Sequence, residues 1–505
     1  MHGRIKKIAL LAAALLMLMG SSRVQRSLDD DRDRLGLTHA EALEDAPPVL
    51  AFTTVALGGF RGLLSNALWM RATQLQEDDK YFEMAQLAEW ITKLEPHYVQ
   101  VWIVQAWNMA YNISVKFSSP VDRWRWVKRG IELLRDEGLR YNPNEILMYR
   151  ELAWFFQHKM GANLDDASMY YKQQWKEEMD QVFGGKKPTL DELIHPQTPD
   201  ETNRAALLRN KFKMDPVFMD EVDKHYGPLE WRLPEASAIY WAALGLREAE
   251  RHPEKVNTND IITLRRVIYQ DMLMAFERGR LIDSPMIGTN IQFAPNLDII
   301  PNVNAAYLEA MTNEPAMRDN ISTARRSFLR DAVYFLYIQD READAARWFK
   351  YLGEQYPDKP ILDGQPDSLP GKLTLAEYAI QCSQVDLNDL SSDKIKNQLE
   401  GLLYRSYMSL LLNEDGRSAA YQALAQQAWE AFRKKIPDTR WAALAIPEPV
   451  ALAEEVRNEL LDPTNGLPPL GRAYLRGKLR MPPEGTPANS PSTNAPATED
   501  TGLPK

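Results

Sequence analysis

The feature that most constrains this fold is a helical pattern at 340–357, in the segment DREADAARWFKYLGEQYP. Its apolar residues Ala345, Phe349 and Leu352 are spaced four and three residues apart, so a helix presents them on one face. Pro357 ends that helix, because proline has no N–H and pushes the residue before it out of the helical region. The segment therefore predicts one helix of a packed pair.

The same order of small, large and proline positions recurs at 79–96 and, less closely, at 425–437. Two turn prolines, Pro96 and Pro143, lie 47 residues apart. Length alone would suggest about three domains for 505 residues, but stacked helical repeats grow by addition instead of dividing into globules. The sequence therefore predicts an all-α chain, an α-solenoid or superhelix of antiparallel helix pairs.

Changes in composition divide the chain into six expected parts. The segment 283–304 lacks a helical period and is rich in proline, and the C-terminal tail is too polar to bury a core. The parts are a signal peptide or membrane anchor at 1–26, a linker and lead-in at 27–62, N-terminal repeats at 63–180, an irregular helical middle with long loops at 181–315, C-terminal repeats at 316–480 and a disordered Pro/Ser/Thr-rich tail at 481–505.

The N-terminus has the order of an export signal. Arg4, Lys6 and Lys7 precede an apolar run at 8–19, and small residues follow at 20–22. At ~1.5 Å per residue the run covers roughly 18 Å of a ~30 Å hydrocarbon layer, which favours a cleaved signal. The lack of an Ala-x-Ala site favours an uncleaved anchor, so both alternatives stay open. Either one predicts that the body lies in the cell envelope, on the outer side of the cytoplasmic membrane.

Charge and residue usage exclude several functions. A net charge of −10 argues against a nucleic-acid partner, because no broad basic surface is available to replace phosphate counterions. The seven histidines show no metal-ligand spacing, and Cys382 is the single cysteine. No glycine-rich phosphate loop is present. The sequence therefore predicts no metal, no cofactor and no enzymatic activity.

The hairpins resemble tetratricopeptide repeats, which pair two antiparallel helices in units of about 34 residues. The segment 340–357 matches the small, aromatic and proline positions of the second helix, whereas 79–96 has Met84 where a small residue is expected. The region 183–304 departs from the pattern. The resemblance implies a scaffold that binds other proteins in a concave groove lined by the first helix of each pair.

Applied to the helices expected at 99–117 and 145–160, the resemblance places two sets of side chains on that groove. Aromatic rings offer contact area there, and the Arg150 guanidinium offers two parallel N–H groups to a carboxylate. The alternative is that Trp107 and Trp154, which occupy equivalent places in their helices, pack in the core between repeats. The candidate groove residues are Gln100, Trp107, Tyr111, Arg150, Trp154 and His158.

The predicted function is an exported or membrane-anchored scaffold that binds peptide or helical segments of other proteins at the cell envelope. The alternative is a helical protein that binds glycan or cell wall, with weak lytic-transglycosylase-like hydrolysis. The C-terminal third carries no Glu-Ser catalytic signature, which weakens the enzymatic alternative. Capture of protein partners or of glycan would separate the two.

Overall fold

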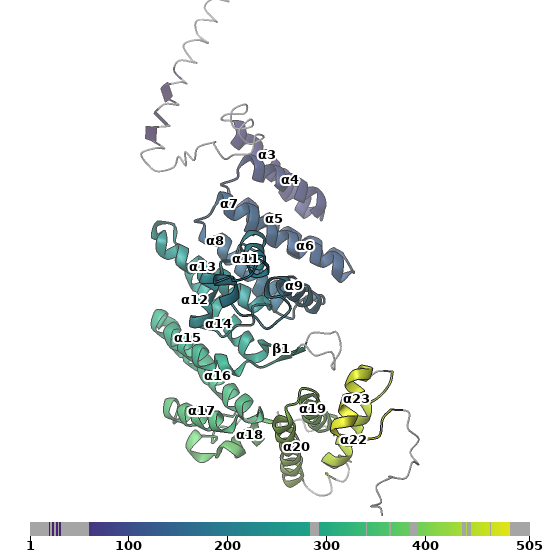
Figure 1. The fold of residues 1–505 in the computed structure, drawn as a ribbon. Coiled ribbons are helices and arrows are strands. Elements are labelled where there is room, and N and C mark those ends of the chain that lie inside the picture. The colour runs from purple at the N-terminus through teal and green to yellow at the C-terminus, as the bar shows by residue number, and fades with distance from the viewer. Residues whose placement is uncertain are drawn as a thin grey trace, which may run out of the picture. The chain divides into compact units, whose positions relative to one another are not determined.

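The computed structural model describes residues 60–484, except 283–291, 340, 363–364, 384–391, 437–440, 442–445 and 465, and a few single residues between 20 and 31. The chain divides into two compact units, Met1–Tyr98 and Val99–Lys505. Nearly all secondary structure in the described part is helical, which confirms the predicted all-α class (Figure 1). None of the described helices has both the length and the apolar character needed to cross a membrane. The predicted signal at 8–19 and the tail from 485 onward lie outside the described residues.

In the first unit, helices α3 (Phe60–Glu77) and α4 (Tyr81–Leu94) pack against each other. The short turn between them places Asp79 in the left-handed region, with φ of 58°. Helix α4 has the bounds that its periodicity predicts. Met84 is 2% exposed, so the large residue at this expected small position is buried.

The second unit begins with helices that are interrupted by π-helical turns. One π-helical turn follows α5 directly after Trp107, and another follows α8 directly after Trp154. A π turn inserts an extra residue, so the apolar period shifts within one continuous helix. The segments are α5 (Val99–Trp107) with Asn108–Ile113, α6 (Pro120–Glu132) with Leu133–Gly138 and α7 (Leu139–Tyr141), α8 (Ile146–Trp154) with Phe155–Gly161, and α9 (Ser168–Phe183).

The segment 181–315, for which the sequence predicts long loops, is mostly helical. Its prolines stand in the first helical turn, where the missing N–H has no partner to lose, and they therefore begin helices. Thr198 and Glu201 form a capping box at the start of α11. The helices are α10 (Asp191–Ile194), α11 (Pro199–Lys211), α12 (Pro216–Tyr226), α13 (Pro234–Arg251) and α14 (Thr258–Arg278).

The segment expected to lack helical structure at 283–304 is helical at its C-terminal end. Strand β1 (Arg280–Ile282) pairs antiparallel with β2 (Gln292–Ala294), and α15 then begins at Ile300 with Pro301 in its first turn. The expectation missed this start because Pro301 was taken as a helix breaker. The remaining helices are α15 (Ile300–Asn313), α16 (Arg318–Ile338), α17 (Glu342–Gln355), α18 (Leu375–Ser383), α19 (Ser392–Leu411), α20 (Asp415–Lys435), α22 (Pro449–Leu460) and α23 (Pro469–Lys478).

Two apolar clusters form the core of the second unit. The larger joins residues from Trp102 to Tyr378, and the smaller joins Ile338 with side chains of α19 to α23. In α17, Ala345 and Leu352 are fully buried. Phe349 is half-buried, with its ring centroid 5.5 Å from that of Tyr378. The face that the sequence predicts for this helix is thus the packed one.

Charged groups are also buried in this core, where α9, α13 and α14 meet. Lys172 and Asp271 are both 0% exposed. The Lys172 ammonium donates to Asn163 Oδ1 at 3.0 Å, and Gln157 Nε2 donates to Asp271 Oδ2 at 2.8 Å. Burial lowers the pKa of Lys172 to about 8 and raises the pKa of Asp271 well above its usual value. Because these pKa values differ from their ordinary values, the free energy of unfolding of the protein depends on pH through both groups.

The contribution of Lys172 to the stability of the protein should rise with pH above about pH 8. The folded state releases the Lys172 proton near pH 8, whereas the unfolded chain keeps it to about its ordinary pKa of 10.5. The unfolded state therefore binds more protons at this side chain in this window, and the Lys172 contribution to the free energy of unfolding increases with pH by up to ~3 kcal/mol. Urea unfolding of the parent protein and of Lys172→Met at several pH values measures the effect. Parallel pH profiles for the two proteins would contradict it.

Candidate binding site

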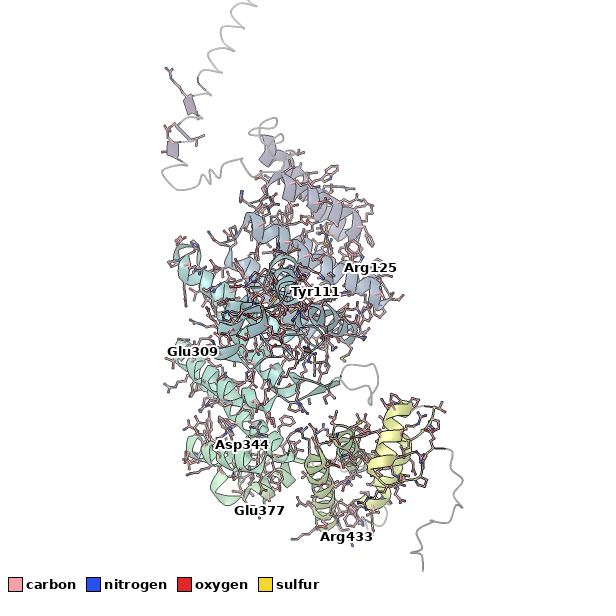
Figure 2. All side chains as sticks on the ribbon, viewed as in Figure 1. Tyr111, Arg125, Glu309, Asp344, Glu377 and Arg433 are labelled. Atoms are coloured by element: carbon pink, nitrogen blue, oxygen red, sulfur yellow. The ribbon has the colours of Figure 1, made fainter. Side chains whose placement is uncertain are left out.

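Most of the predicted groove residues come together between α5 and α8. The ring centroids of Trp107 and Tyr111 are 4.4 Å apart, and those of Trp154 and His158 are 4.7 Å apart. The two stacks are joined because the Tyr111 hydroxyl lies 3.2 Å from His158 Nδ1. Figure 2 labels Tyr111 among the side chains of the chain. Gln100 is exposed on the first turn of α5. The equivalence of the two helices thus produces one aromatic cluster.

Arg150, the charged residue among the predicted groove residues, forms ion pairs within the protein. Arg150 donates to Glu151 on its own helix and to Asp260 at the start of α14. Both carboxylates are buried, at 6% and 8% exposed. Glu151 also accepts a hydrogen bond of 2.7 Å from Trp107 Nε1. The Arg150 guanidinium is therefore held within the protein, where it neutralises two buried acids.

The titratable groups around the aromatic rings of this cluster have shifted pKa values or are paired with an opposite charge. Burial lowers the pKa of His158, and the neighbouring charge of Lys159 lowers it further. The Lys159 ammonium pairs with Asp165 at 2.6 Å. Burial, reinforced by the charge of Glu151, raises the pKa of Tyr111 above its usual value. The arrangement joins two successive helices through stacking and paired charges, and it offers partly exposed rings to a ligand.

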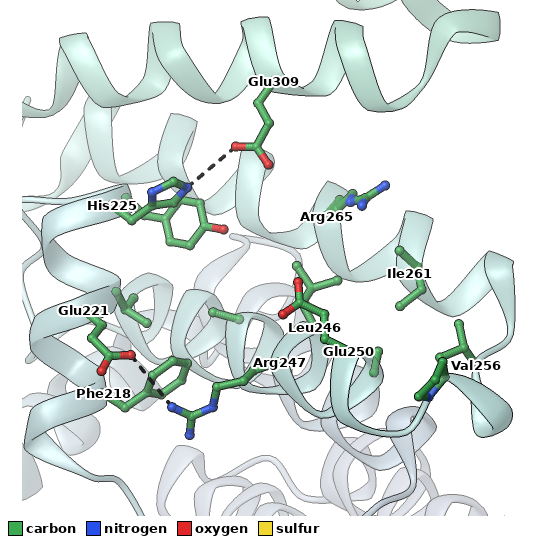
Figure 3. A pocket seen from close by; sticks show the side chains of 15 residues that line it. Phe218, Glu221, His225, Leu246, Arg247, Glu250, Val256, Ile261, Arg265 and Glu309 are labelled. Carbon is green, nitrogen blue, oxygen red and sulfur yellow. Dashed lines mark ion pairs between the residues drawn. The ribbon is translucent and has the colours of Figure 1, made fainter.

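A cleft of about 640 Å³ lies among α12, α13, α14 and α15, away from the predicted residues (Figure 3). Its base is apolar, with Phe218, Val222, Leu246 and Ile261 among the lining side chains. Charged residues of both signs stand around this base. They are Glu221, His225, Arg247, Glu250, Arg265 and Glu309.

The charged groups of the cleft are only loosely paired. The Arg247 guanidinium lies 3.7 Å from the centre of the Phe218 ring and 3.8 Å from a Glu221 oxygen. The buried Nε of Arg247 makes no hydrogen bond with any described residue. Across the cleft, His225 Nε2 lies 3.6 Å from Glu309 (Figure 3).

Arg265, from α14, forms no ion pair with any residue that the structure describes. Together with the buried Nε of Arg247, it leaves donors in the cleft that no described residue uses. The cleft can therefore accept hydrogen-bonding and charged groups from a partner.

A compact turn fixes one wall of the cleft. Asp223 accepts hydrogen bonds from the Leu229 N–H at 2.8 Å and from Trp231 Nε1 at 3.1 Å. These bonds tie the end of α12 to the chain that enters α13. This turn belongs to the segment 225–234, which is rich in aromatic residues and contains two prolines. Sequence reasoning missed the site because its residues come from four helices and have no common spacing.

Comparison of the chain with protein-family models, with curated protein sequences and with solved structures finds no match in any of the three. The geometry of the cleft and of the aromatic cluster is therefore the basis for assigning a function.

Proposed function

We propose that the protein is a tetratricopeptide-like α-solenoid scaffold that binds segments of other proteins in the cleft among α12, α13, α14 and α15. The order of packing supports the solenoid. Helix α13 packs on α8 and α14, α14 packs on α15, and α16 packs on α15 and α17. The contacts from α13 to α17 follow the chain order, as stacked helix pairs require, whereas the contact of α13 with α8 joins helices that α9 to α12 separate along the chain.

The make-up of the cleft carries the functional part of the proposal. An amphipathic helix or an extended peptide can place apolar anchors against Phe218, Leu246 and Ile261, which line the cleft. Its charged groups then meet Glu221, Glu309 and the unpaired Arg265 at the edge. Protein interfaces combine an apolar centre with a polar rim in this way. The mixed signs of the rim also match a peptide better than a nucleic acid, which requires a basic surface.

We further propose that this binding occurs outside the cytoplasmic membrane and without catalysis. The basic residues at 4–7 and the apolar run at 8–19 support export or anchoring. The partners are then proteins of the cell envelope, bound through short segments.

Photo-crosslinking in intact cells tests both parts of the proposal. A photoreactive amino acid at Ile261 in the cleft should give a discrete adduct with an envelope protein. The same group at Val217, an exposed residue of α12 that does not line the cleft, is the matched control. Equal adducts from both positions would contradict the cleft assignment, and adducts with cytoplasmic proteins alone would contradict the location. Adducts that carry only cell-wall glycan would favour the glycan-binding alternative.

The identified partner segment is then made as a peptide and titrated into the purified full chain. Arg265→Gln should weaken binding at least ~10-fold, because a charged contact at an interface contributes more than ~1.4 kcal/mol when it is desolvated. Its melting temperature should stay near that of the parent, because Arg265 has no ion pair to lose. Unchanged affinity would show that the segment binds elsewhere.

A further inference from the structure

A second pocket of about 460 Å³ lies where the β1–β2 hairpin meets the ends of α14 and α16 and the helices α19 and α20. It shares no lining residue with the cleft described above. One part of its wall carries three arginines, Arg280, Arg405 and Arg417. The rest includes the apolar side chains Ile282, Phe293, Phe335, Ile338, Met408 and Leu412.

The arginines outnumber the carboxylates available to them. Arg280 Nη1 lies 3.2 Å from one oxygen of Glu414, and Arg417 Nη1 pairs with the other oxygen. Arg405 makes no ion pair with the described residues, and its side chain hydrogen-bonds to Tyr421. The remaining lining acid is Glu277, whose pKa is raised by burial. Two carboxylates thus line the pocket together with three arginines.

The guanidinium groups keep unused hydrogen-bond donors. The Nε atoms of Arg280 and Arg417 are buried and have no hydrogen-bond partner in the described part of the chain. Each guanidinium has five N–H donors in a planar fork that fits a carboxylate.

Local electrostatics favour an added anion in the same place. Burial lowers the pKa of Arg417. The charge of Glu414 acts in the opposite direction, and the nearby charge of Arg280 lowers the pKa again. Arg417 also lies in the first turn of α20, a helix of 21 residues whose N-terminal end carries partial positive charge. A bound anion would relieve the repulsion between Arg280 and Arg417.

We infer that this pocket binds an organic carboxylate with an apolar tail, held by Arg405 and Arg417 at its head and by the apolar wall along its tail. Arg280 supplies a further donor to the same head group. The chemistry is shared by a free fatty acid and by the C-terminal carboxylate of a peptide that ends in an apolar residue. The inference is independent of the partner cleft, because the two sites share no residue.

Isothermal titration of the purified full chain tests the inference with two pairs of probes. Decanoate is compared with decanol, and a peptide ending in leucine is compared with its C-terminally amidated form. In at least one pair, the charged probe should bind at least ~10-fold more tightly than its neutral counterpart, because a charge-assisted contact contributes more than ~1.4 kcal/mol. The pair that shows the difference tells whether a free acid or a peptide C-terminus is the source. Equal binding within both pairs, or no binding of any probe, would overturn the inference.

Arg405→Gln should reduce the affinity for the charged probe at least ~10-fold while the melting temperature is kept, because Arg405 is exposed and has no ion pair to lose. Arg347→Gln on α17 is the matched control, since that side chain is 70% exposed and does not line the pocket. An unchanged affinity in Arg405→Gln, or an equal loss in Arg347→Gln, would show that the anion does not bind at this pocket.

Discussion

Arg150→Glu should lower the free energy of unfolding by about 3–5 kcal/mol, the range for breaking a buried ion pair. Arg150 lies between Glu151 and Asp260, which are 6% and 8% exposed. The substitution would place three carboxylates together in a partly buried site. Glu151 would lose its hydrogen bonds from Arg150 and keep the one from Trp107 Nε1. Urea unfolding measures the loss directly.

Arg125→Glu is the matched control for this charge reversal. Arg125 is 73% exposed and pairs with Asp122 within α6, so its reversal should cost less than ~1 kcal/mol. If Arg150→Glu were as stable as Arg125→Glu, Arg150 would be a surface residue free to meet a ligand. The groove assignment of the predicted aromatic set would then regain support. A large loss in the free energy of unfolding of Arg150→Glu would instead show that these residues hold α5 and α8 together.

Arg325→Ala should also destabilise the protein by about 3–5 kcal/mol. Arg325 is 3% exposed and donates to Asn304 on α15 and to Tyr351 and Gln355 on α17. Its removal leaves the buried Asn304 and the half-buried Tyr351 with fewer partners and opens a cavity, and both effects are costly. Because one side chain from α16 connects two other helices, the loss should spread beyond a single contact. Chemical denaturation and hydrogen exchange of α15 and α17 measure it.

A lysine in place of Arg325 gives a sharper test of this connection. Lysine keeps the charge but lacks the planar fork, so Arg325→Lys should recover only part of the stability. Arg347→Ala on the exposed face of α17 should change the stability by less than ~1 kcal/mol. Full recovery in Arg325→Lys would mean that charge alone, and not the set of directed hydrogen bonds, holds these helices together.

Local sequence patterns predicted many of the helices. The period through 81–94 gives α4 with its observed bounds, and the segment at 340–357 gives the buried pair Ala345 and Leu352. These predictions succeed because one helix face is a local property of residues three and four apart. They fail where proline has two opposite meanings. Pro301 stands in the first turn of α15, whereas the proline content of 283–304 had been taken as evidence against a helix there.

The candidate sites show a different limit. The equivalence of Trp107 and Trp154 was visible in the sequence, and the two residues do belong to one cluster. The partner of Arg150 was not visible, because Asp260 is 110 residues away and no spacing connects them. The cleft and the arginine pocket are likewise assembled from side chains of several helices.

By itself, the sequence determined that this chain is helical, where several of its helices begin and end, and which face of α17 is apolar. Only the tertiary structure decided which charges neutralise one another and which arginines, such as Arg265 and Arg405, form no ion pair with the described residues. The physical reason is range. Helix formation and amphipathic faces depend on neighbours within a turn or two. Burial, desolvation and ion pairing depend on which distant helices come into contact.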